Sequence, residues 1–195
     1  MNLQKEQTYH IFNRGNQRQK IFFTTENYFF FLQKLRKELT PYCETLAYCL
    51  MPNHFHLLVH INYTSSPVKD EDSITGTVPI LNRKIGTLQS SYTRAIQKQE
   101  LFTGSLFQQK TKAVQIKTDN QLLTCVNYIH QNPMKAKLVD KMEEWEFSSF
   151  REYCKLKEPA FCNQSLLRSF LQYEPTKFYD MSYDLIPEHD LKTIF

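Results

Sequence analysis

The sequence predicts an α+β fold built around a four-stranded antiparallel sheet. Three observations lead to this expectation: apolar residues alternate in four short stretches, helical periodicity appears between them, and a two-residue turn joins the middle two stretches. The resulting order is strand, helix, strand, strand, helix, strand, which is the split pattern of ferredoxin-like folds and of RNA-recognition domains. A further helix follows the fourth strand. We therefore expect helices on one face of the sheet, plus one added helix toward the C-terminus.

The first strand and helix are marked by clear local signals. Residues 9–13 alternate and are rich in strand formers, and the turn at residues 14–16 ends this strand. Thr25 is a candidate N-cap of the first helix, and Glu26 places an acidic side chain in its first turn. Pro41 is expected to end this helix.

A hairpin and a polar segment come next. Residues 45–51 and 54–61 form the second and third strands, and only Pro52-Asn53 separates them. Residues 62–79 are mostly Thr, Ser, Pro, Lys, Asp and Glu, which predicts a long mobile loop. This loop is either a tolerated insertion or a functional lid.

The second half begins with a helix over residues 80–99 and a fourth strand over 106–116. Thr118 and Asp119 cap the next helix, which is expected to end at Pro133 because a proline pushes the residue before it out of the helical region. A short helix at 166–171 and a polar tail follow. We expect one domain over residues 1–155, with 156–195 as a C-terminal helix and tail.

Composition narrows the class of protein. The chain has 195 residues, enough for one core and a small appendage, and its net charge of +4 permits a nucleic-acid partner without requiring one. Its four glycines leave no room for a glycine-rich phosphate loop. The five cysteines form no C-x-x-C pair, so we expect reduced thiols in a cytoplasmic protein. The N-terminus is polar and no apolar run approaches the ~20 residues of a membrane span, so we expect no signal peptide and no membrane partner.

Two histidines open the third strand. Side chains alternate along a strand, so His54 and His56 project from one face while Phe55 points into the core. Two imidazoles held side by side form half of a metal site or one wall of an acid–base site. Taken alone, such a pair is more typical of an ordinary strand, and the rest of the chain must supply the other half of a site.

The last helix of the sheet domain supplies candidates for that half. Tyr128 and Asn132 are four residues apart and share one helix face, while Ile129 points toward the sheet. Two neutral imidazoles and an amide oxygen suit Mg²⁺ or Mn²⁺ when phosphate or water completes the shell. Such a metal polarises a phosphoryl oxygen, and tyrosine is a competent oxygen nucleophile.

The combined motifs resemble those of the single-tyrosine HUH transposases, which include the insertion-sequence-200-like transposases and the REP-associated tyrosine transposases. HUH denotes His-hydrophobic-His, here His54-Phe55-His56. The resemblance covers roughly residues 8–155 and is carried by five segments: 9–15, 48–59, 104–110, 128–139 and 145–150.

This resemblance implies a function and a set of roles. Tyr128 would be the nucleophile, with His54, His56 and Asn132 as ligands of a divalent metal, Mg²⁺ or Mn²⁺. A glutamine is usual at the third ligand position in the insertion-sequence branch, so Asn132 favours the REP-associated branch. The implied reaction is nicking of single-stranded DNA beside a hairpin, through a 5′-phosphotyrosine link that is later rejoined to another strand. The partner would be single-stranded DNA with hairpin ends.

Seven basic residues are candidates for phosphate contacts, although a solvated face explains them equally well. They are Arg14, Arg18, Lys20, Lys110, Lys112, Lys135 and Lys137. The departures from the family pattern are the 62–79 segment and the chain beyond residue 155. We expect these to affect DNA-end specificity and assembly and to leave the chemistry alone.

Two other functions stay open. The same fold order suits a non-catalytic single-stranded nucleic-acid binding module, which would need exposed aromatics on the central strands. The second possible function is a histidine-based metal hydrolase that uses water as the nucleophile. The absence of any Asp or Glu beside the His-x-His pair counts against this function. The sequence leaves the choice between a monomer and a homodimer with the tyrosine supplied in trans undecided.

Overall fold

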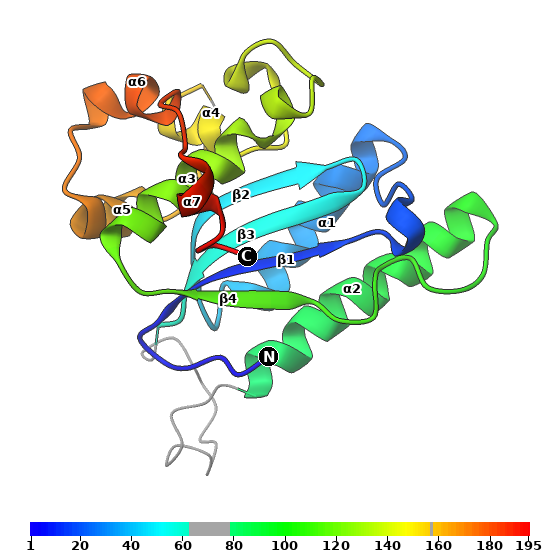
Figure 1. The fold of residues 1–195 in the computed structure, drawn as a ribbon. Helices are drawn as coiled ribbons and strands as arrows, with labels where there is room; N and C mark the ends of the chain where they lie inside the picture. The colour runs from blue at the N-terminus through cyan, green and yellow to red at the C-terminus, as the bar shows by residue number, and fades with distance from the viewer. Residues whose placement is uncertain (63–78, 157) are drawn as a thin grey trace.

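The computed structural model describes residues 1–62, 79–156 and 158–195, and it contains one antiparallel sheet in the order β2-β3-β1-β4 (Figure 1). The strands are β1 (Thr8–Arg14), β2 (Glu44–Met51), β3 (His54–His60) and β4 (Lys112–Ile116). The predicted α+β class and element order are therefore confirmed. The predicted mobile loop at 62–79 lies, apart from its two ends, outside the described residues.

Two helices cover one face of the sheet and a third covers the other (Figure 1). The first face carries α1 (Thr25–Leu39) and α2 (Pro79–Glu100), and α3 (Asp119–Lys135) lies across the second. The core beneath the first face is aromatic: the Phe31 ring lies 5.3 Å from that of Phe55 and 5.0 Å from that of Tyr92, between ring centroids. Because Phe55 faces α1 and α2, strand alternation turns its two histidine neighbours toward the α3 side.

Two boundaries differ from the predicted ones for local reasons. The N-cap of α1 is Thr24, one residue earlier than expected, and Asn27 completes a capping box with it. The fourth strand begins only at Lys112 instead of 106. Before it, the Asn13 amide donates hydrogen bonds to the Gln108 carbonyl and the Thr111 hydroxyl, and an isolated bridge pairs Gly15 with Phe107, so the segment is attached without a regular ladder.

The end of α3 was predicted wrongly. The helix continues through Pro133 to Lys135, and the Ala136 N–H donates to the Asn132 carbonyl. A proline removes one helical hydrogen bond, yet the helix continues for two residues beyond it. Pro133 is buried, and the Gln131 side chain donates to the carbonyls of Ser182 and Asp184. As a consequence, Asn132 lies inside the helix, one turn from Tyr128.

The C-terminal part folds back over α3 instead of trailing away as a polar tail. It contains α4 (Phe150–Tyr153), α5 (Gln164–Leu171), α6 (Phe178–Ser182) and α7 (Glu188–Leu191), with 3₁₀ turns before α4 and α6. The chain then runs back to the sheet, and its C-terminus lies over β3 and β1 (Figure 1). Ile194 is fully buried there. The last two residues therefore reach the same face of the sheet as α3.

Two expectations drawn from composition can be compared with this fold. All five cysteines are free thiols, and four of them are buried. Among the described residues, no helix combines the length and apolar character needed to span a membrane.

Candidate functional site

The paired histidines of β3 meet the tyrosine of α3 on one face of the sheet. In the β1–β3 ladder Phe12 pairs with His56 and Arg14 with His54, so these side chains share a face. The rings of His54 and His56 are 5.0 Å apart, and the Tyr128 ring lies 5.3 Å from that of His56, between centroids. The structure thus brings three of the four predicted reactive groups together within one chain.

Asn132, the fourth, lies close enough to affect both His54 and Tyr128. Its side chain acts to raise the pKa of His54 and to lower the pKa of Tyr128, and its buried Nδ2 has no hydrogen-bond partner among the described residues. The amide therefore sits between the strand histidine and the helix tyrosine, as the i, i+4 spacing on a continuous helix allows.

These groups open into a cavity of about 380 Å³. Its lining combines polar, basic and aromatic side chains: Phe12, Asn13, Arg14, His54, His56, Gln108, Lys110, Lys112, Tyr128 and Phe195. Three of the seven basic residues singled out from the sequence are among them. Arg18, Lys20, Lys135 and Lys137 do not line it. The first two follow β1, and the other two lie at and beyond the end of α3.

Burial keeps the histidines of this site uncharged at neutral pH. It lowers the pKa of His54 to about 4, with the nearby Arg14 charge acting in the same direction. It lowers the pKa of His56 well below the ordinary value and that of His10 to about 4. A metal ion binds neutral imidazole, so the environment favours the protonation state that a ligand needs.

The position of one proton on His54 follows from its partner. Its Nδ1 lies 2.6 Å from the side-chain oxygen of Asn53, and an amide oxygen can only accept. The His54 Nδ1 therefore carries the hydrogen, and its Nε2 carries a lone pair. This is the arrangement in which an outer partner orients a metal-ligating histidine.

The donor set can be tested for its fit to a divalent cation. The His56 Nε2 is buried and has no hydrogen-bond partner among the described residues, which is costly for a polar atom unless something else binds it. The parts of the chain that the structure describes contain no cluster of three or more His, Cys, Asp or Glu suited to a metal. Two imidazoles and the Asn132 oxygen therefore form an incomplete set of ligands. Such a set suits an ion whose coordination shell is completed by water or phosphate.

Tyr128 is not ionised in this resting arrangement. Burial raises the pKa of its phenol, and the Asn132 side chain and the Arg14 charge oppose that effect. A nucleophilic tyrosine must lose its proton, so added positive charge beside the hydroxyl would favour reaction.

Sequence reasoning missed several residues in and beside the cavity. Phe12, which lines it, and His10, which is buried behind it against His56, have the parity of Arg14 on β1, and alternation along the strand was a usable signal for them. Nothing local pointed to Phe195. Its ring nevertheless lies 5.4 Å from the Phe12 ring and 5.6 Å from the His10 ring, between centroids.

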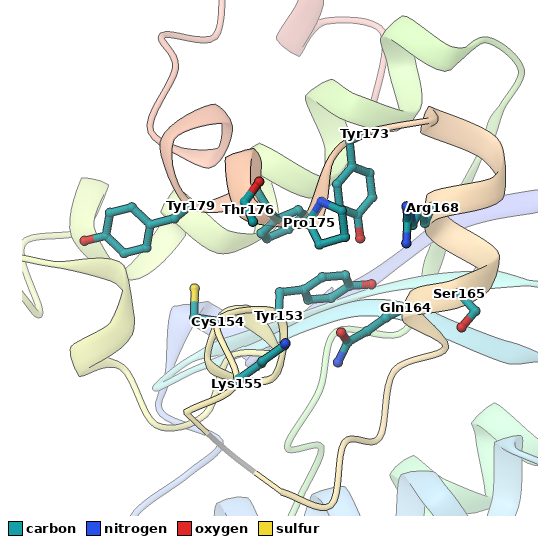
Figure 2. A pocket seen from close by; sticks show the side chains of 11 residues that line it. Tyr153, Cys154, Lys155, Gln164, Ser165, Arg168, Tyr173, Pro175, Thr176 and Tyr179 are labelled. Atoms are coloured by element: carbon teal, nitrogen blue, oxygen red, sulfur yellow. The ribbon is translucent and has the colours of Figure 1, made fainter.

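A second cavity, of about 530 Å³, lies in the C-terminal part, and Figure 2 shows the side chains around it. Its lining includes four aromatic side chains, Tyr153, Tyr173, Phe178 and Tyr179, and two exposed cations, Lys155 and Arg168. Cys154 supplies a thiol, but burial raises the pKa of that thiol to about 11, so it stays protonated at neutral pH. The larger cavity therefore lacks an activated nucleophile, and the reactive groups lie in the smaller one.

The fold and the site together define a class of α+β protein in which a helix tyrosine and two strand histidines share one basic cavity. Comparison with known proteins identifies the family to which the chain belongs. The family profile described as IS200-like transposase matches residues 4–132, more than half of the chain, and the chain belongs to this family. The match includes the sheet, both histidines, Tyr128 and Asn132.

Two individual proteins are similar. Over 116 residues the chain is 27% identical to a Haemophilus influenzae protein described as a REP-associated tyrosine transposase; the match spans 55% of this chain and 58% of that protein. A solved structure of a REP-associated tyrosine transposase bound to a REP hairpin aligns with a TM-score of 0.58 and 17% identity, covering 84% of this chain and 94% of that one. At this identity the likeness shows the fold alone.

Proposed function

We propose that this chain nicks single-stranded DNA beside a hairpin and transfers the strand through a phosphotyrosine link to Tyr128. The observation that carries the proposal is the meeting of the Tyr128 ring and the His56 ring, 5.3 Å apart between centroids, in a cavity with three cationic side chains. Membership of a transposase family and the REP hairpin bound by the structural neighbour support it.

The residues present fit a divalent cation, Mg²⁺ or Mn²⁺. The Nε2 atoms of His54 and His56 and the side-chain oxygen of Asn132 would hold it. When bound, the ion supplies positive charge that polarises a phosphoryl oxygen and favours the ionised phenol.

The chain's own residues account for the remaining steps. Arg14, Lys110 and Lys112 bind the phosphates of the strand and orient one of them toward Tyr128. The Tyr128 oxygen loses its proton and attacks phosphorus, forming a P–O bond to the phenol while the bond to the 3′ oxygen breaks. That oxygen takes up a proton and leaves as a 3′-OH, and the DNA 5′ end stays attached to the tyrosine. Attack by another 3′-OH reverses the step and joins strands.

The geometry needs only one copy of the chain. The tyrosine and the histidines meet within a single molecule, so a tyrosine helix supplied by a second copy is not required. We infer that the monomer is competent for the nicking step.

The structure disfavours the alternative of a non-catalytic binding module. Such a module needs exposed aromatics on the central strands. Tyr9, on the face covered by α1 and α2, is buried, with 4% of its surface exposed. Phe12 lies in the reactive cavity, with the Phe195 ring against it.

The decisive test incubates the purified protein with labelled hairpin-tailed oligonucleotides and Mn²⁺. Denaturing electrophoresis should show a labelled protein band, together with a product ending in a 3′-OH. Cleavage that yields free 5′-phosphate without a protein adduct would instead support a hydrolase that uses water. Binding without metal and without cleavage would support the binding module.

A further inference from the structure

We propose that His10 is a positioning residue for His56, and that the backbone carbonyl of Ile194 sets the proton arrangement of both rings. The inference rests on the proposed function in one respect: it takes His56 to be a metal ligand. The C-terminal residues would then be part of the support of the reactive site, contrary to the expectation that they leave the chemistry alone.

Three groups form a continuous hydrogen-bonded chain on the α3 side of the sheet. The His10 Nδ1 lies 2.8 Å from the Ile194 carbonyl oxygen, and the His10 Nε2 lies 2.9 Å from the His56 Nδ1. The two rings are stacked, with centroids 5.1 Å apart and planes 24° from parallel. His10 and Ile194 are both fully buried, so water does not compete for these bonds.

The direction of each bond follows from the carbonyl. A carbonyl oxygen only accepts, so the His10 Nδ1 must carry a hydrogen. In a neutral imidazole the other nitrogen is then an acceptor, and the His56 Nδ1 must donate to it. The remaining nitrogen, His56 Nε2, is left with a lone pair, and this is the buried atom that has no partner among the described residues.

The opposite arrangement is unfavourable at both ends. A hydrogen on the His10 Nε2 alone would set a nitrogen lone pair against the Ile194 carbonyl, and two buried acceptors at 2.8 Å repel each other. It would also place the His56 hydrogen on Nε2, where it blocks metal binding. The Ile194 carbonyl therefore selects the tautomer in which His56 can act as a ligand.

The carbonyl itself is held in place by the C-terminal fold. The Ile194 N–H donates to the Leu191 carbonyl at the end of α7, and the Thr193 N–H donates to the Asp190 carbonyl. The fully buried Ile194 side chain anchors the same segment. Asn53 performs the equivalent task for His54, so each ligand histidine has its own orienting partner.

The first measurement needs no metal. Long-range ¹H–¹⁵N correlation spectra of the metal-free protein, labelled at histidine, distinguish the two neutral tautomers of each ring. The proposal expects the hydrogen on Nδ1 in both His10 and His56. A hydrogen on the Nε2 of His56 would overturn it, whatever the protein's activity.

The second measurement is the affinity for Mn²⁺ in the absence of DNA. The electron paramagnetic resonance signal of the unbound ion reports how much Mn²⁺ is bound. His10→Gln offers an oxygen near the position of Nε2 and should keep the affinity within about threefold, whereas His10→Leu removes the acceptor and should weaken it about 10–100-fold. His60→Gln is the matched control on β3, because His60 bonds to Thr8 and does not line the cavity. Circular dichroism confirms that each variant is folded.

The outcomes separate this inference from the proposed function. If wild type and the folded His10→Leu variant bind Mn²⁺ equally well, the positioning role is wrong and the proposed function stands. If wild type binds no Mn²⁺ and forms no DNA adduct, the metal-dependent function and the role of His10 in it both fall.

Discussion

The ring of Phe195 packs edge-on against the ring of Tyr128, with centroids 5.0 Å apart and planes at 87°. The same ring contacts His10 and Phe12, and it lines the same cavity as Tyr128. About half of the Phe195 surface is still exposed, so the ring lies at the edge of the cavity and not deep in the core. If Tyr128 reacts with DNA as proposed, its accessibility should depend on the side chain at position 195.

Replacing Phe195 with alanine should speed formation of the covalent adduct several-fold. DNA must displace a partly buried ring whose contacts are worth on the order of 1 kcal/mol. The measurement is the initial rate of adduct formation with a hairpin oligonucleotide and Mn²⁺. Leu185→Ala is the control, because that side chain is 97% exposed and should leave the rate unchanged. An unchanged or slower rate in the Phe195 variant would show that the ring does not obstruct the strand.

Tyr128→Phe should abolish covalent protein–DNA adducts and change DNA affinity by no more than about twofold. The variant removes only the attacking oxygen and keeps the ring that packs beside His56. Electrophoresis under denaturing conditions measures the adduct, and fluorescence anisotropy measures binding. Tyr173→Phe, in the second cavity, should retain the adduct. Adducts that persist without the Tyr128 hydroxyl would remove this residue from its role.

His54→Ala combined with His56→Ala should lose cleavage at every Mg²⁺ or Mn²⁺ concentration tested. The variant lacks two of the three proposed protein ligands, so raising the metal concentration should not restore the site. A single Asn132→Ala change should weaken Mn²⁺ binding and leave both rings in place. Titration of activity against metal concentration distinguishes these cases, and rescue of the double variant by excess metal would contradict the ligand assignment.

Neutralising the cations of the cavity should change the salt dependence of DNA binding. Lys110 and Lys112 both line the cavity, so replacing both with alanine should reduce the slope of log affinity against log salt by about 1.4, or about 0.7 for each phosphate that is no longer neutralised. Lys135 and Lys137 carry the same charge and do not line it. Their double alanine variant is the matched control and should keep the slope.

Glu152→Gln should destabilise the fold by about 3 kcal/mol, because hydrogen bonds to a buried carboxylate are strong and their loss leaves donors unpaired. This fully buried carboxylate accepts from the Tyr48 hydroxyl at 2.8 Å and from the Phe161 and Cys162 amides at 2.7 and 2.8 Å. It thereby joins the C-terminal part to β2. Urea unfolding measures the change, with the exposed Glu158→Gln as control. A loss below about 1 kcal/mol would show that this network does not hold the C-terminal part.

Much of the fold and half of the site could be predicted from patterns of short range. Alternation over residues 54–60 placed both histidines on one face and Phe55 on the other, and the four-residue spacing of Tyr128 and Asn132 placed them on one side of a helix. These relations depend on the chain's own periodicity, which holds wherever a strand or helix forms.

Local signals failed where distant segments outweighed them. Pro133 was expected to end α3, but buried contacts with the C-terminal part carry the helix two residues further. The 106–116 segment was expected to form a strand throughout, but the Asn13 side chain occupies hydrogen-bonding groups over part of it. Basic composition could not tell Lys110 from Lys135, because only the folded chain decides which charges face the cavity.

Patterns in the amino-acid sequence are enough to predict the sheet, the hairpin and the faces on which His54, His56, Tyr128 and Asn132 lie. The hydrogen bonds from His10 to His56 and Ile194, and the contact of Phe195 with Tyr128, are visible only in the folded chain. Periodicity relates residues a few positions apart, whereas these contacts join β1 to β3 and the last two residues to β1 and α3. The two contacts made by Ile194 and Phe195 also depend on how the C-terminal part packs over α3, and no local pattern encodes that packing.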